Sequence, residues 1–335
     1  HTYDDTRRKL LSRDNVGFAL ADVFSKDGSC DLTALFVGSQ GTLGTITEAI
    51  LKVASYNPRT SLLVAGFNGA QALADAVELV APLGPSCLEM IDRTLISLVK
   101  QERNLNVVAT LFEPDTEVPD YILFVECDED NAHKRNKKIK KINKLLSKTA
   151  TAIRVTDDPE LQETLWAARD SSSVVVNYDR GGKVALPVID DCIVPLGKLK
   201  QLISAVSDLA EKHKLELAVW GHAGDANLHV MPLLNLSKLG DRQKIFRLMN
   251  DYFTVVIGLG GSIAAENNDG RLRTPFTHLQ LGEELVQVNA ALKKAADPFM
   301  MLNPGVKTGT KLKDVVDLLG DSYSQARHAD YLPRQ

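Results

Sequence analysis

Two periods of apolar and polar residues alternate along most of the chain. Short apolar runs predict strands at residues 62–67, 87–91, 121–127, 152–155, 215–220 and 227–233. Apolar residues that recur every three or four positions predict helices at 70–81, 93–101, 131–148, 195–212, 238–257 and 280–296. Strands that alternate with helices of this length predict α+β layers, in which helices cover one face of a sheet.

The first 57 residues follow a different pattern. Residues 31–37 predict a loop that enters a strand, and the glycines from Gly38 to Gly44 predict a turn. Residues 46–54 alternate between apolar and polar side chains, which predicts a further strand. We therefore expect a division into residues 1–57, a main domain at 58–305 and a tail at 306–335.

An ordinary globular composition limits the classes of function. Of the 335 residues, 44% are apolar and 24% are charged, and the net charge of −4 gives no basic field for a nucleic-acid partner. Four lysines between Lys137 and Lys141 fall on a predicted helix and are interpreted as its solvated face. The longest uncharged apolar stretch, residues 253–265, is too short to cross a bilayer. Four separated cysteines without a CxxC pair indicate structural thiols in a reducing compartment.

The segment GHAGDANLH carries the strongest chemical signal. Its two imidazoles, His222 and His229, flank a predicted turn between two strands, which can aim both rings at one point. Imidazole pairs suit zinc, manganese or iron when a third ligand is present. Glu266 is a candidate third ligand because it follows the apolar stretch GGSIAA, and a buried carboxylate needs a cation or several donors. Two alternatives stay open: histidines satisfied by ordinary hydrogen bonds, and Glu266 as a surface acid.

Two further segments suggest binding. In GSQGTLGTITE, residues 38–48, a glycine at every third position lets backbone N–H groups approach a phosphate or a flat ring. A plain hairpin turn has the same pattern. Arg169 follows Trp166 in LWAARDS and could clamp a carboxylate through two hydrogen bonds, with a surface salt bridge as the alternative.

In this order the motifs resemble those of the FAD-linked oxidase family, the group of glycolate oxidase, D-lactate dehydrogenase and D-2-hydroxyglutarate dehydrogenase. The resemblance covers roughly residues 15–307 and includes LFVGSQGTLGTITEAILKV, CLEMIDRTL, LWAARD, VIDDCIVP, GHAGDANLH and LNPG. It implies that residues 1–57 end a PCMH/VAO-type FAD-binding domain. Residues 58–305 would then form the substrate (cap) domain, an α+β fold with an antiparallel sheet flanked by helices in ferredoxin-like units.

The resemblance also implies roles for individual residues. His222, His229 and Glu266 would hold a divalent metal, zinc or manganese, while Arg169 and Asn227 would bind the substrate. The FAD would lie along Gly38, Ser39, Gly41, Thr42, Gly44, Ile46 and Asn303.

The activity that the resemblance implies is oxidation of a D-2-hydroxy acid, such as D-lactate or glycolate, to the 2-oxo acid. A hydride would pass to the flavin, with the metal on the substrate hydroxyl. The electron acceptor would be a quinone, a cytochrome or an electron-transfer flavoprotein. We expect a cytoplasmic location, with a peripheral one at the inner face of the membrane and a homodimer left open.

Two departures from the family pattern change these expectations. No glycine-rich pyrophosphate loop precedes residue 38, and the first residue is His1 rather than Met, so we expect a truncated chain with an incomplete FAD site, inactive and colourless alone. Second, Asn267 stands where the family has the histidine expected as general base, and an amide cannot accept a proton usefully near pH 7.

Three explanations for Asn267 stay open. The metal suffices with proton loss to solvent, Asp269 serves as the base, or the activity has changed. Two other functions stay open as well. One is a metal-dependent hydrolase that uses the same three ligands, and the other is a non-catalytic module that binds metal or acid.

Overall fold

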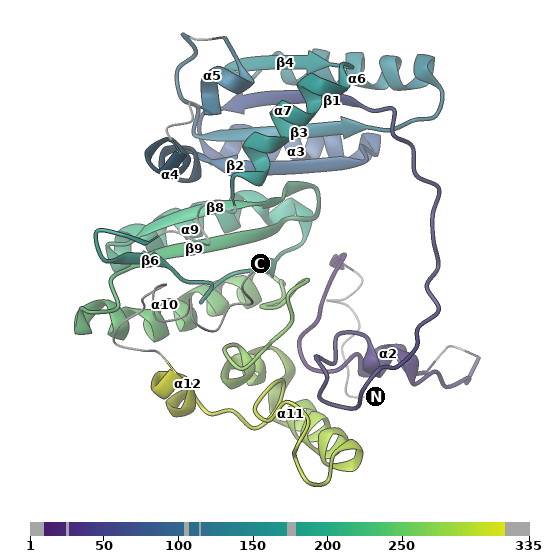
Figure 1. Cartoon of the computed structure of the whole chain (residues 1–335), viewed down its shortest axis with the longest axis vertical. Coiled ribbons are helices and arrows are strands. Elements are labelled where there is room, and N and C mark those ends of the chain that lie inside the picture. Colours follow the sequence, from purple (N-terminus) through teal and green to yellow (C-terminus); the bar gives the residue numbers. More distant parts are fainter. Residues whose placement is uncertain (1–9, 25–26, 104–106, 114, 173–178, 319–335) are drawn as a thin grey trace, which may run out of the picture.

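A nine-stranded sheet, antiparallel throughout, forms the centre of the structure (Figure 1). The computed structural model describes residues 10–24, 27–103, 107–113, 115–172 and 179–318. The strand order is β4-β1-β3-β2-β8-β9-β6-β5, with β7 also paired to β9. The strands are β1 Ser61–Phe67, β2 Cys87–Asp92, β3 Tyr121–Cys127, β4 Ala152–Thr156, β5 Asp179–Arg180, β6 Lys183–Ala185, β7 Cys192–Ile193, β8 Glu216–His222 and β9 Asn227–Leu234.

The first four strands form a ferredoxin-like unit. Helix α3 (Ala70–Val80) connects β1 to β2, and α6 (Ala132–Leu146) connects β3 to β4, so the chain order is the split β-α-β arrangement with strand order β4-β1-β3-β2. Strands β1 and β3 pair over seven positions. The predicted antiparallel sheet with flanking helices in ferredoxin-like units is confirmed.

A short pairing joins this unit to the second half of the sheet. Strands β2 and β8 share two register pairs, Met90 with Gly221 and Ile91 with Trp220. Beyond this seam, β8 and β9 pair over seven positions and form the longest hairpin of the second half. The two candidate histidines lie on either side of its turn, His222 at the end of β8 and His229 on β9.

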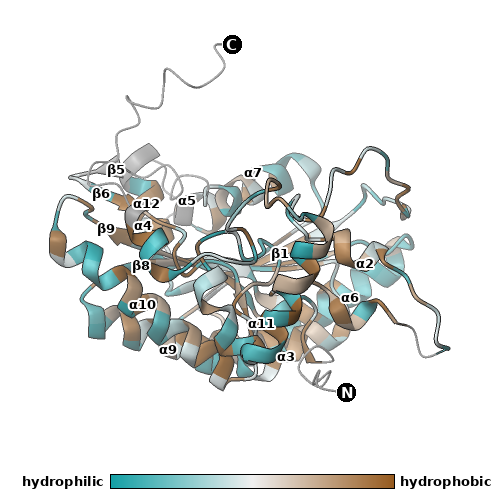
Figure 2. Ribbon diagram, turned by 90° about the horizontal axis from the view of Figure 1, so that it is seen from below, coloured by the Kyte–Doolittle hydropathy of each residue, from teal (hydrophilic) through white to brown (hydrophobic). Residues whose placement is uncertain are grey.

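Helices cover both faces of the sheet (Figure 2). One face packs against α3, α6, α9 (Leu199–His213) and α10 (Leu239–Gly258), and the other packs against α4 (Arg93–Arg103), α5 (Val107–Leu111) and α7 (Pro159–Asp170). The prediction that helices cover one face was therefore incomplete. Strand β1 is buried at every position, and the continuous apolar run in its sequence is the pattern expected of a strand covered on both faces.

Short elements and two more helices complete the described part of the chain. Helix α11 changes direction at Gly282, whose φ is 75°. The bounds are η1 Leu20–Asp22, α2 Thr33–Phe36, η2 Ala81–Leu83, η3 Leu196–Lys198, η4 Ala223–Asp225, η5 Thr274–Phe276, α11 Thr277–Ala296 and α12 Leu312–Leu318.

The segment before β1 differs from its prediction. Residues 45–60 have no regular secondary structure, so the predicted strand at 46–54 is wrong. Ile50 is 99% exposed and Val53 85% exposed, because no strand among the described residues pairs with this segment and no layer covers it. An alternating pattern becomes a strand only where a partner completes its hydrogen bonds. Residues 31–37 likewise contain the short helix α2 in place of a loop that enters a strand.

The other sequence-level expectations concern thiols and membranes. All four cysteines are free, and Cys127 and Cys192 are buried, as expected for structural thiols. Within the described ranges, no helix combines the length and the apolar character needed to cross a bilayer.

Candidate metal centre

The hairpin β8–β9 brings His222 and His229 together. His222 ends β8, and His229 lies on β9 opposite Trp220, with the two imidazole centroids 5.7 Å apart. Gly221 has a φ of 142°, and a Cβ there would lie 2.6 Å from the carbonyl oxygen of Asn227. A glycine is therefore required at this position, because any side chain would push the two strands apart beside the histidines.

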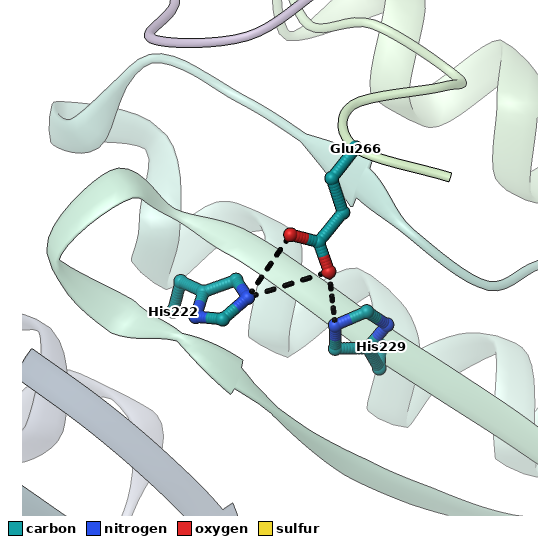
Figure 3. A group of neighbouring side chains, drawn as sticks. All are labelled: His222, His229 and Glu266. Atoms are coloured by element: carbon teal, nitrogen blue, oxygen red, sulfur yellow. Dashed lines mark hydrogen bonds and ion pairs between the residues drawn. The ribbon is translucent and has the colours of Figure 1, made fainter. Parts of the chain in front are cut away.

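Glu266 approaches the two rings from a different part of the chain (Figure 3). Its loop follows α10, and its carboxylate lies 3.2 Å from Nε2 of His229 and 3.4 Å from Nε2 of His222. One ligand atom from each of the three residues lies within 4.8 Å of the others. The three residues singled out from the sequence as metal ligands thus converge on one point.

Asp191 sets the position of the Glu266 loop. This carboxylate is fully buried and accepts backbone N–H bonds from Ala265, Glu266 and Asn267 at 3.1, 3.1 and 2.7 Å. Three N–H groups that point at one carboxylate fix the local backbone, because each lost bond would leave a buried polar group unpaired. The direction of the Glu266 side chain therefore depends on a residue 75 positions earlier.

A second carboxylate stands behind each histidine. Glu89 Oε1 lies 2.6 Å from Nδ1 of His222, and Asp190 Oδ1 lies 2.9 Å from Nδ1 of His229. Each carboxylate accepts a hydrogen bond from Nδ1–H, so Nε2 of each ring faces Glu266, the arrangement usual for metal-binding histidines. Two imidazoles and a carboxylate with an open side fit a divalent cation such as zinc or manganese.

The contact between Glu89 and His222 shifts the pKa of both groups. The hydrogen bond that Glu89 accepts from His222 raises the pKa of the imidazole above its usual value, although burial acts in the opposite direction. Burial alone would raise the pKa of Glu89, but the bond from His222 and the ion pair with Arg169 outweigh it, and the pKa is lowered. Each of the two groups therefore favours the charged form of the other.

Arg169 is part of the same network. Its Nε and Nη2 both donate to Oε2 of Glu89, at 3.2 and 2.8 Å, and its side chain is 16% exposed. The exposed surface salt bridge considered from the sequence is therefore not what forms. A largely buried pair forms instead, and its carboxylate also contacts His222. In this arrangement the guanidinium directs its strongest bonds to Glu89.

Arg13 lies on the open side of the cluster. Its Nη1 donates to Glu266 Oε2 at 2.9 Å and to Asn227 Oδ1 at 3.1 Å, and its Nη2 lies 3.6 Å from Asp225. Arg13 also lines a cavity of about 330 Å³ together with Glu89 and His222. The N-terminal segment thus supplies a cation to a site built mainly from the sheet.

The remaining predicted polar residues lie at different depths. Asn227 is fully buried, and its amide group donates to Asp191 Oδ1 at 3.0 Å. Asn267 is exposed beside Glu266. Asp269 is buried, accepts bonds from Lys307 and the backbone N–H of Gly17, and has no described contact with the three candidate ligands. Asp269 therefore acts as a structural partner of Lys307.

The glycine-rich segment contacts the loop that follows Glu266 and the segment that contains Asn303. Gly38 and Gly41 have φ values of 74° and 68°, and a Cβ on Gly38 would lie 2.9 Å from Oδ1 of Asn268. Asn303 Nδ2 donates to the carbonyl oxygen of Gln40 at 2.5 Å. Asparagine side chains fill the space beside both glycines, Asn268 at Gly38 and Asn303 at Gly41, so the missing Cβ atoms allow these close contacts within the protein.

The other residues predicted for the cofactor site share this turn but differ in exposure. Ser39 and Thr42 are buried, and Gly44 is half-buried. Ile46 is 63% exposed. The turn itself is held by Lys293, whose Nζ donates to the carbonyl oxygen of Thr42 at 2.7 Å.

Four residues of the site were not found from the sequence. Glu89 stands in the motif CLEMIDRTL and Asp190 in VIDDCIVP. The sequence therefore showed the two carboxylates but did not show which histidine each one contacts. Asp191 and Arg13 carried no separate signal. Paired acids next to apolar strand residues are the one pattern that could have identified Asp190 and Asp191, because such acids need buried donors.

Comparisons with known proteins agree with these motifs. The family model described as FAD linked oxidases, C-terminal domain, matches residues 57–306. Glycolate oxidase subunit GlcD of Bacillus subtilis is 27% identical over 279 residues, which are 82% of this chain and 56% of that protein. D-lactate dehydrogenase of Anaerostipes hadrus is 25% identical over 294 residues, 85% of this chain and 60% of that protein. The chain thus spans little more than half the length of these relatives.

Among solved structures, substrate-bound p-cresol methylhydroxylase has a similar fold. The TM-score is 0.54 at 14% sequence identity, and the match covers 77% of this chain and 54% of that one. At this identity the likeness concerns the fold alone.

Proposed function

The chain belongs to the FAD linked oxidases, and on that basis we propose that it supplies the metal- and acid-binding part of a FAD-dependent dehydrogenase of D-2-hydroxy acids. The observation that carries the proposal is the convergence of His222, His229 and Glu266 beside an open cavity. D-lactate and glycolate are the proposed substrates, because relatives of the chain bear the names D-lactate dehydrogenase and glycolate oxidase.

His222, His229 and Glu266 would hold a divalent cation. Such a cation supplies positive charge beside a hydroxyl oxygen, which makes a very weakly acidic hydroxyl easier to deprotonate. Glu89 and Asp190 keep the Nε2 atoms of both imidazoles directed at this position. Asp191 holds the backbone of Glu266, so the three donors are positioned before any ligand arrives.

The flavin would supply the acceptor for the electron pair that leaves the substrate carbon. Gly38, Gly41 and Asn303 are the residues of this chain that we propose to line it. The Gln40 carbonyl holds Asn303, and the buried Lys293 holds the carbonyl of Thr42, so the turn is fixed from two sides. A quinone, a cytochrome or an electron-transfer flavoprotein would accept the electrons afterwards.

The hydroxyl proton has a direct route to solvent. Glu266 and Asn267 are exposed at the mouth of the site, so water reaches the position where the hydroxyl would lie. Asp269 is excluded from this role because Lys307 and the backbone of Gly17 hold its Oδ2 in a buried pocket. We therefore propose proton loss to water, assisted by the positive charge at the three ligands.

Metal analysis with a matched variant tests the metal site. Wild-type protein dialysed against Zn²⁺ or Mn²⁺ is expected to retain about one equivalent, and His222→Ala much less. Equal retention in both would discard the ligand set. His278→Ala is the control, because His278 is an exposed histidine whose Nδ1 contacts only the backbone of Pro275 among the described residues.

A second measurement separates an oxidoreductase from a non-catalytic module. Protein that contains FAD is mixed anaerobically with D-lactate, and the flavin absorbance near its visible maximum is followed. Bleaching that depends on the metal and disappears in His222→Ala supports the dehydrogenase. A stable flavin band with bound metal would indicate a binding module instead.

A further inference from the structure

The two carboxylate oxygens of Glu266 have different partners. Oε1 lies 3.2 Å from Nε2 of His229 and 3.4 Å from Nε2 of His222, so it faces both rings (Figure 3). Oε2 also lies 3.4 Å from Nε2 of His222, but it accepts a shorter hydrogen bond from Nη1 of Arg13, at 2.9 Å. Donor atoms that each lie about 2.0–2.1 Å from a tetrahedral zinc are about 3.3–3.4 Å apart. The distances from Oε1 to both rings are close to this separation, so Oε1 is the oxygen that fits a metal ligand.

The guanidinium of Arg13 is itself held from other sides. Its Nη1 also donates to Oδ1 of Asn227 at 3.1 Å, and its Nη2 lies 3.6 Å from Oδ2 of Asp225. Asn227 is fully buried, and its Nδ2 donates to Oδ1 of Asp191 at 3.0 Å, which leaves its Oδ1 for the guanidinium. Asp191 also accepts the backbone N–H of Glu266 at 3.1 Å. The hydrogen bonds thus close a ring that runs from Asp191 to both the backbone and the carboxylate of Glu266.

The backbone next to this guanidinium is attached to the segment that leads to Glu266. The N–H of Asn15 donates to the carbonyl oxygen of Ala264 at 2.9 Å. Oδ1 of Asp14 accepts a hydrogen bond from Oγ of the buried Ser262 at 2.8 Å. These bonds fix the N-terminal segment against the Glu266 loop, so the guanidinium reaches the carboxylate from a set direction.

A cation and a guanidinium can share one carboxylate when each takes its own oxygen. Carboxylates that bind a metal are commonly hydrogen-bonded by a neighbouring group, which orients them. A carboxylate without such a bond can turn and bind the metal through both oxygens, which fills an additional coordination position. The hydrogen bond from Arg13 keeps Oε2 of Glu266 from that second contact.

We infer that Arg13 is a positioning residue of the metal site: it holds Oε2 of Glu266, restricts this ligand to Oε1 and so keeps a coordination position open for the substrate hydroxyl. The inference rests on the proposed function. Arg13 acts through Glu266 and remains bonded to it when the metal is present. Because Arg13 lies outside the matched residues 57–306, the N-terminal segment completes a site that the C-terminal domain otherwise builds.

Titration with Co²⁺ in place of Zn²⁺ tests this role without any turnover. The visible absorption of bound Co²⁺ reports its geometry, because four-coordinate Co²⁺ absorbs more strongly than Co²⁺ with five or six ligands. The wild type is expected to give a strong band. Arg13→Met, which donates no hydrogen bond, is expected to give a band about twofold weaker and to bind Co²⁺ about tenfold more weakly. Arg13→Lys retains a donor and should recover part of both.

The outcomes separate the two proposals. Binding of Co²⁺ by the wild type that is lost in His222→Ala supports the metal site. If the bands of the wild type and Arg13→Met are then equally strong, or if Arg13→Met binds Co²⁺ more tightly, the role of Arg13 is overturned and the metal site stands. If the wild type binds no Co²⁺, the metal site and the role of Arg13 both fall. Arg93→Met, which removes an exposed arginine paired with Asp120, is the matched control and should behave as wild type.

Discussion

Nδ1 of His222 lies 2.6 Å from Oε1 of Glu89, a residue 133 positions earlier in the chain. Glu89 is on β2 and His222 is on β8, so the contact spans the seam between the two halves of the sheet. Arg169 holds the other oxygen of Glu89. The chain Arg169–Glu89–His222 therefore connects helix α7, the ferredoxin-like unit and the candidate metal centre.

Glu89→Gln is expected to weaken metal binding by about 10- to 100-fold, the usual effect of removing the group that orients a metal-binding histidine. The amide keeps the shape but loses the charge that stabilises the Nδ1 proton of His222. Mn²⁺ or Zn²⁺ titration measures the change. Glu126→Gln serves as the control, because Glu126 is a half-buried residue of the neighbouring strand β3 that accepts a hydrogen bond from Ser86. Unchanged affinity in Glu89→Gln would show that Glu89 does not orient the histidine.

Asn267→His is expected to raise kcat on D-lactate at least about tenfold in protein that contains FAD, because general base catalysis contributes 10²- to 10⁴-fold. The introduced imidazole would stand next to Glu266, at the mouth of the site. The pH profile of kcat should gain a limb near the ordinary pKa of histidine, about 6.5. Asn268→His is the control one residue further along, where the side chain contacts Gly38. If kcat on D-lactate is the same in Asn267→His and Asn268→His, position 267 does not face the substrate hydroxyl.

Asp92→Asn is expected to change the pH dependence of stability. Burial raises the pKa of Asp92 to about 7, whereas an unfolded aspartate titrates near about 3.9. The folded state therefore retains a proton that the unfolded state loses, and the free energy of unfolding falls as pH rises through this interval, by at most about 1.4 kcal/mol per pH unit. Urea unfolding of the variant should show a smaller fall between pH 4 and pH 7, roughly the two pKa values.

Asn at position 92 keeps the oxygen that accepts the backbone N–H of Leu95, so the start of α4 should persist. Asp75→Asn, at an exposed position of α3, is the control. If Asp92→Asn and the wild type lose stability in parallel across this interval, the Asp92 carboxyl is not protonated in the folded state.

Lys307→Met is expected to destabilise the fold by about 3–5 kcal/mol, because it leaves the buried Asp269 carboxylate without its cation. Lys307 Nζ also donates to the carbonyl oxygens of Asn15 and Gly17, at 3.0 and 2.6 Å, and so ties the N-terminal segment to the C-terminal one. The double variant Lys307→Met with Asp269→Asn should recover part of the loss. Urea unfolding at neutral pH measures the free energy of unfolding of the single and the double variant. A loss below about 1 kcal/mol in Lys307→Met would contradict the view that Lys307 neutralises the buried Asp269 carboxylate.

The sequence predicted helices and strands correctly where their side chains are buried on one face or on both faces. Residues 121–127 and 227–233 read as strands because apolar side chains dominate them, and both are strands in the structure. Residues 46–54 carry an equally good alternation, but no partner strand or covering layer exists for them among the described residues. Periodicity records the faces of an element, whereas a strand also needs a second chain segment at hydrogen-bonding distance.

The candidate site shows the same limit. His222 and His229 could be paired from the sequence because they flank one short turn. Glu266 was a candidate because it directly follows the apolar stretch GGSIAA, and the resemblance implied the same residue, but its 44-residue separation from His222 gave no local signal of their contact. Arg13 lies 253 residues from Glu266, so no pattern in the chain could reveal their contact. Asp269 stands three residues after Glu266, yet its carboxylate accepts a hydrogen bond from Lys307, which lies 38 residues further along the chain.

The two-pair seam between β2 and β8 has a consequence for how the molecule unfolds. Few backbone bonds join the ferredoxin-like unit to the second half of the sheet, and the Glu89–His222 contact is one of the side-chain links across them. A cation at His222 stabilises the state in which both halves are docked, by mass action. One apolar core spans both halves, so unfolding should remain a single transition, and its midpoint in a thermal melt should fall when a chelator removes the metal.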